Sequence, residues 1–234
     1  MCRINNRHVP YYTIQATTPT RAWVIFSHGN AEDISISYHH LKIFSNIISA
    51  NIIGYDYRGY GTNAGEPTEA DCKQDLLAIF TMVINEMQIP IQNIILMGHS
   101  IGCGPTLWLA REIQNGKMAK KGLPGVVGAV VSVSGFTSCC AVVDRRLSYI
   151  PFTDMFDNEN SVAPLRMPLF IAHGNNDEII NVSHAIRLWD DVKYKENGSL
   201  FIVDGCDHNS ILGNVEFQTA LVSFLEEYFV KRIV

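Results

Sequence analysis

The sequence predicts an α/β fold, a doubly wound and mainly parallel sheet with helices on both faces. Two observations carry this prediction. Short apolar runs with many branched residues alternate with longer segments of helical periodicity along most of the chain. The 234 residues are 47% hydrophobic, which is enough to bury one large core. We therefore expect residues 1–234 to form a single domain.

The first half of the chain alternates between strand and helix patterns. Residues 11–17 alternate weakly and predict an edge strand, whereas the apolar residues 22–26 and 52–55 predict core strands. A first helix is expected from the spacing of Leu41, Ile43, Phe44, Ile47 and Ile48. A second is expected over residues 69–87, where Leu76, Phe80 and Val83 recur at near-helical spacing before Pro90.

The second half repeats this order with one interruption. Strands are expected at residues 94–97, 126–133, 169–172 and 200–203, and helices at residues 103–113, 182–189 and 215–230. Residues 137–167 break the rhythm because they mix aromatic and charged residues without a clear period. We interpret them as a small cap or loop excursion that builds the substrate pocket.

Composition excludes several classes of function. The net charge is −5 and the 18 Lys and Arg residues form no long run, so nucleic acid is not an expected partner. The first residues lack the roughly 7 to 15 apolar positions of a signal peptide, and no run approaches the roughly 18 needed to span a bilayer. We expect a cytoplasmic protein without a stable membrane anchor, with peripheral membrane association left open.

The six cysteines do not indicate disulfides or a metal site. Their positions, 2, 72, 103, 139, 140 and 206, contain no C-x-x-C pair, and several lie in apolar stretches. The scattered Cys and His residues show no zinc spacing, and no phosphate-loop or dinucleotide fingerprint is present. No metal or organic cofactor is expected, and lipidation of Cys2 is left open.

The most informative motif is Gly-His-Ser-Ile-Gly at residues 98–102. It lies between the predicted strand 94–97 and the predicted helix 103–113, which places Ser100 on a sharp strand-to-helix turn. A G-x-S-x-G sequence in this context is typical of a nucleophile elbow, whose glycines allow close packing of strand and helix. A chance match in an ordinary turn is the alternative that the five residues alone leave open.

Two later loops supply the groups that would activate Ser100. Asp177 follows the predicted strand 169–172, and His208 follows the predicted strand 200–203. Sites in such sheets form beyond the carboxyl ends of the strands, so Ser100, His208 and Asp177 can meet as nucleophile, base and orienting acid. Their order, Ser, Asp, His, is that of triads built on this kind of sheet.

Each member has an alternative role. His208 could be a solvated loop residue, and Asp177 could cap the helix that starts near Asn181. Rival acids are Glu178, Asp204 and Asp207, together with Asp144, Asp154 and Asp157 in the predicted cap. His28, His99 and His173 flank glycines, and we interpret them as residues that support loop structure.

An acyl-transfer site also needs donors for the negative oxygen of a tetrahedral intermediate. The backbone N–H of Ile101, directly after Ser100, is the first candidate, and that of Asn30 in the turn after strand 22–26 is the second. Loss of one such donor would be expected to cost about 3 to 4 kcal/mol in the chemical step.

These motifs resemble the α/β-hydrolase superfamily over nearly the whole chain from Trp23. More narrowly, they resemble the branch that contains protein depalmitoylases and is also described as prolyl-oligopeptidase-like serine peptidases. The matching segments are SHGNAED (27–33), YDYRGYG (55–61), GHSIG (98–102), HGNNDE (173–178) and GCDHN (205–209). The resemblance implies Ser100 as nucleophile, Asp177 as acid, His208 as base, and Asn30 and Ile101 as oxyanion donors.

The chain departs from that branch in two ways. Membrane-bound depalmitoylases carry an N-terminal cysteine cluster where this chain has only Cys2, and prolyl-oligopeptidases carry a large substrate-selecting domain. We expect a serine hydrolase that cleaves carboxylic esters or thioesters of small molecules or acylated proteins. A serine peptidase and a non-catalytic binding protein on the same fold are the alternatives.

Overall fold

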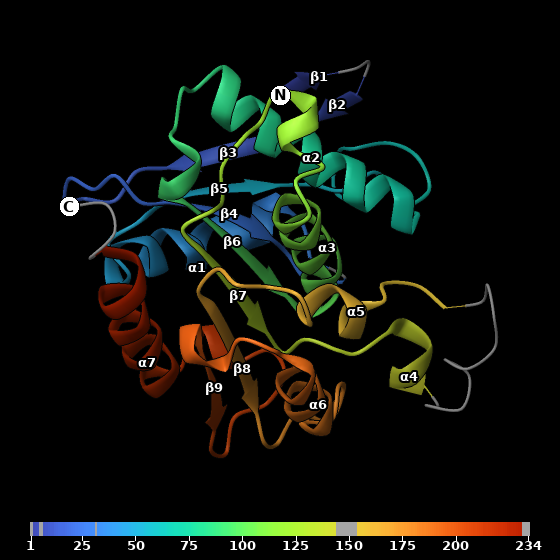
Figure 1. The fold of residues 1–234 in the computed structure, drawn as a ribbon, viewed down its shortest axis with the longest axis vertical. Helices are drawn as coiled ribbons and strands as arrows, with labels where there is room; N and C mark the ends of the chain where they lie inside the picture. The colour runs from blue at the N-terminus through green and yellow to red at the C-terminus, as the bar shows by residue number, and fades with distance from the viewer. Residues whose placement is uncertain (1, 5–6, 31, 144–153, 231–234) are drawn as a thin grey trace.

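The computed structural model describes residues 2–4, 7–30, 32–143 and 154–230. Its centre is a seven-stranded sheet in the order β3-β5-β4-β6-β7-β8-β9, in which β3 is antiparallel to β5 and all other neighbours are parallel (Figure 1). The predicted mainly parallel sheet is thereby confirmed. The strands are β3 (Tyr11–Ile14), β4 (Trp23–Ser27), β5 (Asn51–Tyr55), β6 (Ile94–His99), β7 (Ala129–Val133), β8 (Leu169–Gly174) and β9 (Gly198–Val203).

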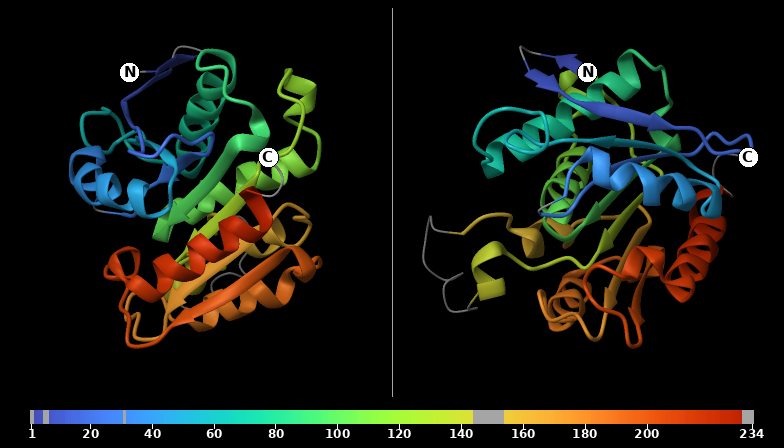
Figure 2. Two further views of the ribbon diagram at one scale, coloured as in Figure 1. Left: turned by 90° about the vertical axis from the view of Figure 1, so that its left-hand side faces the viewer. Right: turned by 180° about the vertical axis from the view of Figure 1, so that it is seen from behind.

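Helices cover both faces of this sheet, as the sequence predicts (Figure 2). One face packs against α1 (Ile34–Ile47) and α7 (Val215–Leu225), and α7 continues into a π-helical turn, Glu226–Val230. The other face packs against α2 (Glu69–Asn85), α3 (Cys103–Gln114) and α6 (Ser183–Asp191). None of the helices in the described part of the chain is long and apolar enough to cross a bilayer.

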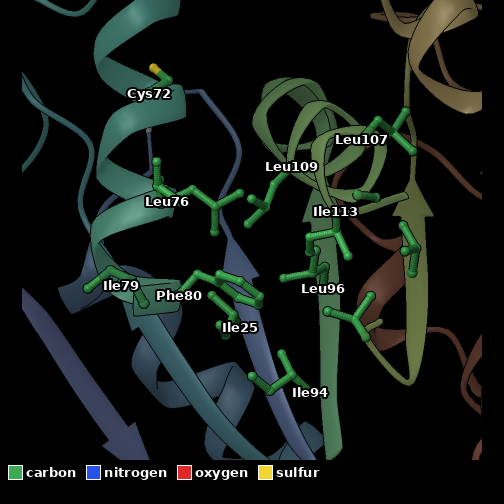
Figure 3. Close-up of a cluster of buried hydrophobic side chains, with 14 of the residues drawn as sticks. Ile25, Cys72, Leu76, Ile79, Phe80, Ile94, Leu96, Leu107, Leu109 and Ile113 are labelled. Carbon is green, nitrogen blue, oxygen red and sulfur yellow. The ribbon is translucent and has the colours of Figure 1, made fainter. Parts of the chain in front are cut away.

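The strands sort their side chains between two hydrophobic clusters. In β4, Ile25 faces the cluster under α2 and α3, whereas Val24 and Phe26 face the cluster under α1 and α7. This alternation follows from the two-residue period of a strand. Figure 3 shows the first cluster, where Phe80 of α2 lies close to Ile25 between the helices and the sheet. The sheet is therefore buried on both faces, and its chemistry must lie at the strand ends.

The structure differs from several sequence-based expectations, and two of these differences concern the path of the chain most. A short antiparallel hairpin of β1 (Cys2–Ile4) and β2 (Arg7–Val9) was not expected. Strand β7 begins at Ala129 rather than at residue 126, because the chain turns at Gly125, where φ is +112°. A Cβ at Gly128 would lie 2.2 Å from Phe229 and 2.4 Å from the carbonyl of Gln92, so this loop is packed tightly beneath the strand.

The described parts of residues 137–167 contain two short helices, α4 (Cys139–Val143) and α5 (Asn158–Val162). Asp154 accepts N–H bonds from Cys140 and from Met155, both at 2.8 Å. Phe156 lies against Gly104 of α3, and its N–H donates to Glu69 of α2 at 2.9 Å. This end of the segment is thus held on the α2 and α3 face, while residues 144–153 lie outside the described residues.

Candidate active site

Ser100 occupies a strained turn between β6 and α3. Its φ is +54°, in the left-handed region that residues with a Cβ rarely adopt, and it opens a 3₁₀ turn, Ser100–Gly102, that runs directly into α3. A Cβ at Gly98 would lie 2.5 Å from the carbonyl oxygen of Gly102, and one at Gly102 would lie 2.1 Å from that of Ser27. Both glycines of the motif are therefore required by close packing around the serine.

The structure brings Ser100, His208 and Asp177 together from three strand ends. His208 Nε2 lies 2.8 Å from Ser100 Oγ, and His208 Nδ1 lies 2.6 Å from Asp177 Oδ2. All three residues are less than a tenth exposed. The imidazole thus connects the hydroxyl and the carboxylate in one line of hydrogen bonds, shielded from most of the solvent.

The loops after β8 and β9 are joined to each other by backbone contacts. A Cβ at Gly174 would lie 2.1 Å from the carbonyl oxygen of Cys206, so only glycine permits this approach. Asn176 donates its N–H to the same carbonyl at 3.0 Å. The side chain of Asn175 accepts from the N–H of Gly205 at 2.8 Å. These contacts fix the Asp177 loop against the His208 loop.

The Asp177 carboxylate accepts hydrogen bonds on both oxygens. Oδ1 accepts the N–H groups of Ile179 and Ile180 at 2.9 and 2.8 Å, while Oδ2 accepts from His208 and lies 3.1 Å from Nε2 of His173. Burial acts to raise the pKa of Asp177, but the hydrogen bonds from His173, His208 and Ile180 outweigh it and hold the pKa well below its usual value. Asp177 therefore carries a negative charge beside the imidazole.

This carboxylate fixes the proton positions on His208. An ionised carboxylate only accepts hydrogen bonds, so Nδ1 of His208 must carry the proton that points to Asp177. Nε2 then presents its lone pair to the hydroxyl of Ser100. This tautomer is the one that can take a proton from a serine hydroxyl.

Two other histidines support the site, one at each end. His99 Nε2 donates to the carbonyl oxygen of His208 at 3.0 Å, and burial lowers the pKa of His99 to about 4. His173 donates to the carbonyl of Ile180 at 2.7 Å as well as facing Asp177. The sequence predicts a loop-supporting role for both, and for His99 a place beside the elbow. Sequence reasoning missed the contact of His173 with the carboxylate, because His173 belongs to strand β8.

The rival acids have other partners. Asp207 accepts the N–H groups of Asn209 and Ser210 in its own turn, and Asp204 accepts from Asn175 at 2.6 Å. Glu178 is exposed, Asp154 holds the N–H of Cys140, and Asp157 caps α5. Asp144 lies outside the described residues.

The turn after β4 lies beside the serine. A Cβ at Gly29 would lie 3.6 Å from that of Ser100, and the side chain of Asn30 accepts from the hydroxyl of Tyr60 at 2.7 Å. The N–H of Gly29 donates to Glu32 Oε2 at 3.2 Å. Neither Tyr60 nor Glu32 was predicted as part of the site, and together they brace the turn that presents Asn30.

Ile101 follows Ser100 in the first turn of the continuous 3₁₀ and α-helical segment. The first N–H groups of a helix have no intrahelical acceptor and carry the positive end of the helix dipole. The Ile101 side chain packs against the hydrophobic core, so the residue can offer its backbone to the site.

A cavity of about 930 Å³ opens at Ser100. It is lined by Ser100, His208 and Asn30 at one end and by residues of α1 along its length. No residue of the described parts of 137–167 lines it, because those parts pack over α2 and α3 instead. Among the described residues, no group of His, Cys, Asp or Glu side chains could hold a metal ion.

Comparison with known proteins gives a consistent set of similarities. The profile of a family described as "alpha/beta hydrolase fold" matches residues 22–157. The human alpha/beta hydrolase domain-containing protein 17B is 30% identical over 210 residues, which is 88% of this chain and 67% of the relative. The Caenorhabditis elegans protein aho-3, described by the same domain name, is 28% identical over 87% of this chain and 57% of its own length.

Solved structures resemble the fold closely at low sequence identity. Est1E from Butyrivibrio proteoclasticus, in its complex with ferulic acid, superposes with a TM-score of 0.72 at 16% identity and covers 96% of both chains. The esterase Pf2001 of Pyrococcus furiosus superposes with a TM-score of 0.69 at 18% identity. At these identities the likeness concerns the fold alone.

Proposed function

The chain belongs to the α/β-hydrolase family, and from this premise we propose that it is a serine hydrolase that cleaves carboxylic ester or thioester bonds. The observation that carries the proposal is the line from Asp177 through His208 to Ser100, with contacts of 2.6 and 2.8 Å. In this proposal Ser100 is the nucleophile, His208 the general base and Asp177 the acid that orients it.

The reaction proceeds through two acyl transfers. Ser100 Oγ attacks the carbonyl carbon while its proton moves to Nε2 of His208, and the same proton then passes to the departing alcohol or thiol. Water then attacks the carbonyl carbon of the acyl-enzyme and gives one proton to His208. His208 returns this proton to Ser100 Oγ as the carboxylic acid is released. The charge on Asp177 stabilises the imidazolium that forms in both steps.

The oxyanion of each tetrahedral intermediate is assigned to the backbone N–H groups of Ile101 and Asn30. Ile101 is supported by its place at the start of the helical segment, where the dipole favours a negative charge. Asn30 is supported by its place on the cavity wall with Ser100 and by the contacts of its turn with Tyr60 and Glu32. Donors held in this way need little reorganisation during the reaction.

The finer proposal is that the substrates include acyl thioesters, as in the depalmitoylase branch that the motifs resemble. A thiol has a pKa near 8.5 and leaves more readily than an alcohol, and His208 can donate its proton to either leaving group. Acylated proteins and small acyl esters are the proposed substrates, and a peptide amide is the substrate that the peptidase alternative requires.

A labelling experiment tests the proposal. A fluorophosphonate probe should modify Ser100 in the wild type and leave Ser100→Ala unmodified, with the site identified by peptide mass spectrometry. Acyl esters and thioesters should compete for labelling and be hydrolysed, whereas peptidyl amides should do neither. Absence of labelling in a folded wild-type protein, or turnover of esters by Ser100→Ala at the wild-type rate, would refute the assignment.

A further inference from the structure

The cavity at Ser100 extends along one face of α1, where three isoleucines line it. Ile36, Ile43 and Ile47 all contribute to its wall, although Ile36 and Ile43 are 56% and 67% exposed. Steps of seven and eleven residues complete nearly two and three helical turns, so these side chains form a narrow stripe. Large apolar side chains gathered on the surface at an active site usually mark a binding surface.

This stripe adjoins the face of α1 that packs on the sheet, and Phe44 of that face also lines the cavity. Leu41 and Phe44 of the same helix are 0% and 3% exposed and belong to the hydrophobic cluster under α1 and α7. The apolar surface of α1 therefore extends beyond its core face, through the exposed Ile36, Ile43 and Ile47. Ile179 and Leu212, from the loops after β8 and β9, line the same cavity.

Several polar groups of the cavity belong to the loops that carry the site, and Gln218 of α7, which donates to the carbonyl of Leu212 at 2.9 Å, is a further one. Glu32 accepts from the N–H of Gly29, while Asn209 and Ser210 lie beside His208 in the sequence. Farther along α1 the stripe contains one titratable side chain, His40, whose pKa burial lowers, so that it is neutral at pH 7. Its Nε2 lies 3.5 Å from Glu32. A hydrocarbon chain would thus meet an uncharged, mostly apolar wall beyond the mouth.

We infer that the acyl chain of the substrate lies along α1, with its carbonyl at Ser100 and its methyl end directed toward Ile47. This inference rests on the proposed function and adds where the chain binds and which side chains select its length. The stripe from Ile36 to Ile47 is about 16 Å long at the usual helical rise. The cavity volume of about 930 Å³ is near the upper end of the roughly 300 to 1,000 Å³ typical of ligand pockets.

Ile47 also lines a second cavity. This cavity has a volume of about 520 Å³, and Ile47 lines it together with Val222 and Leu225 on the α7 side. Ile47 therefore stands between the two cavities. A medium-length chain would end at Ile47, and a longer chain would pass it and contact α7.

The test compares the chain-length preference of matched variants. Ile43→Glu places a charge in the middle of the stripe, where it would meet the chain of a dodecanoyl ester but lie beyond that of a butyryl ester. Ile186→Glu makes the same exchange at an exposed isoleucine of α6 that lines neither cavity. Met155→Glu tests the 137–167 segment, where Met155 is also exposed. The measured quantity is the ratio of kcat/KM for dodecanoyl and butyryl p-nitrophenyl esters.

Burial of each methylene of the acyl chain raises kcat/KM roughly fourfold, so losing the contacts of the last few methylenes should lower kcat/KM strongly. We expect Ile43→Glu to lower the dodecanoyl-to-butyryl ratio at least tenfold, and Ile186→Glu and Met155→Glu to leave it within twofold of the wild type. A ratio that Met155→Glu lowers and Ile43→Glu does not would overturn the inference and place the chain under residues 137–167.

The remaining outcomes separate this inference from the proposed function. If the wild type labels with fluorophosphonate and hydrolyses the butyryl ester but Ile43→Glu keeps the wild-type ratio, the inference alone fails. If Ile43→Glu instead converts a dimer into a monomer at an unchanged ratio, measured by light scattering, the groove is an interface between copies and the inference is wrong. If the folded wild type neither labels nor hydrolyses esters, the proposed function fails and the inference falls with it.

Discussion

His173 shares an oxygen of Asp177 with His208. Its Nε2 lies 3.1 Å from Oδ2, the atom that also accepts from Nδ1 of His208 at 2.6 Å, and its ring is fully buried. The same Nε2 is 2.7 Å from the carbonyl oxygen of Ile180, which keeps the proton of His173 on this nitrogen. We interpret His173 as a positioning residue that keeps Asp177 ionised and aligned.

Replacing His173 should therefore affect the chemical step. His173→Leu removes a donor to a charged acceptor, a loss of about 1.5 to 3 kcal/mol, so we expect kcat to fall by roughly tenfold to a hundredfold with KM within about twofold. His173→Gln retains an N–H donor and should recover part of this loss. The exposed His39→Leu is the control for an unrelated histidine. Equal losses in His173→Gln and His173→Leu would argue for a packing role only.

Gly174 should control how closely the Asp177 and His208 loops approach. A Cβ at this position would lie 2.1 Å from the carbonyl oxygen of Cys206, so Gly174→Ala must push the two loops apart. Overpacking of this kind costs about 1 to 3 kcal/mol in stability, and a displacement of about 1 Å can cost about a hundredfold in rate.

Chemical denaturation and ester kinetics of the same variant measure both effects. Gly213→Ala is the matched control for stability, because a Cβ there meets no atom within 4 Å. If Gly174→Ala unfolded at the wild-type denaturant concentration with the wild-type kcat, the close approach would not be required.

Much of the fold and of the candidate site can be predicted from the residues that follow each predicted strand. Parallel strands place their carboxyl ends at one edge, so a serine after β6, an aspartate after β8 and a histidine after β9 fall close together. Gly98 and Gly102 also indicate the elbow, because the close contacts that exclude a Cβ there lie within or next to the turn itself. These inferences use only neighbouring residues and the handedness of the sheet.

Other features depend on contacts that sequence periodicity does not encode. Ile43 and Ile47 fit the helical apolar pattern that predicts α1, but the pattern does not show that they line the cavity. His173 lies within β8, where a strand residue and a site residue look alike. The position of Phe156 against Gly104 decides that its segment packs on α3, and this pairing joins residues far apart in the chain.

Two buried histidines should make stability depend on pH. Burial lowers the pKa of His28 and of His99 from 6.5 to about 4 in the folded state. As the pH falls below about 6.5, the unfolded chain binds these protons first, so the free energy of unfolding decreases down to about pH 4. Each group can contribute about 3 kcal/mol to this loss.

Urea denaturation at about pH 7 and at about pH 4.5 checks this dependence. The two pH values lie on either side of the histidine reference pKa of about 6.5. His99→Gln should flatten the decrease by removing one of the two groups, whereas the exposed His39→Gln should leave it unchanged. A free energy of unfolding that stayed constant over this range in the wild type would contradict the buried, neutral state of both rings.

The strain at Ser100 should be measurable as a difference between two inactive variants. Ser100 has a φ of +54°, and Ser100→Ala keeps the Cβ that makes this conformation unfavourable, whereas Ser100→Gly removes it. Both should lose turnover by roughly a millionfold if the nucleophile is gone.

We expect Ser100→Gly to have a free energy of unfolding about 1 kcal/mol higher than that of Ser100→Ala, because glycine adopts positive φ without steric cost. Urea denaturation of the two variants at pH 7 measures this difference. Ser100→Ala at least as stable as Ser100→Gly would mean that the elbow stores no strain at this residue.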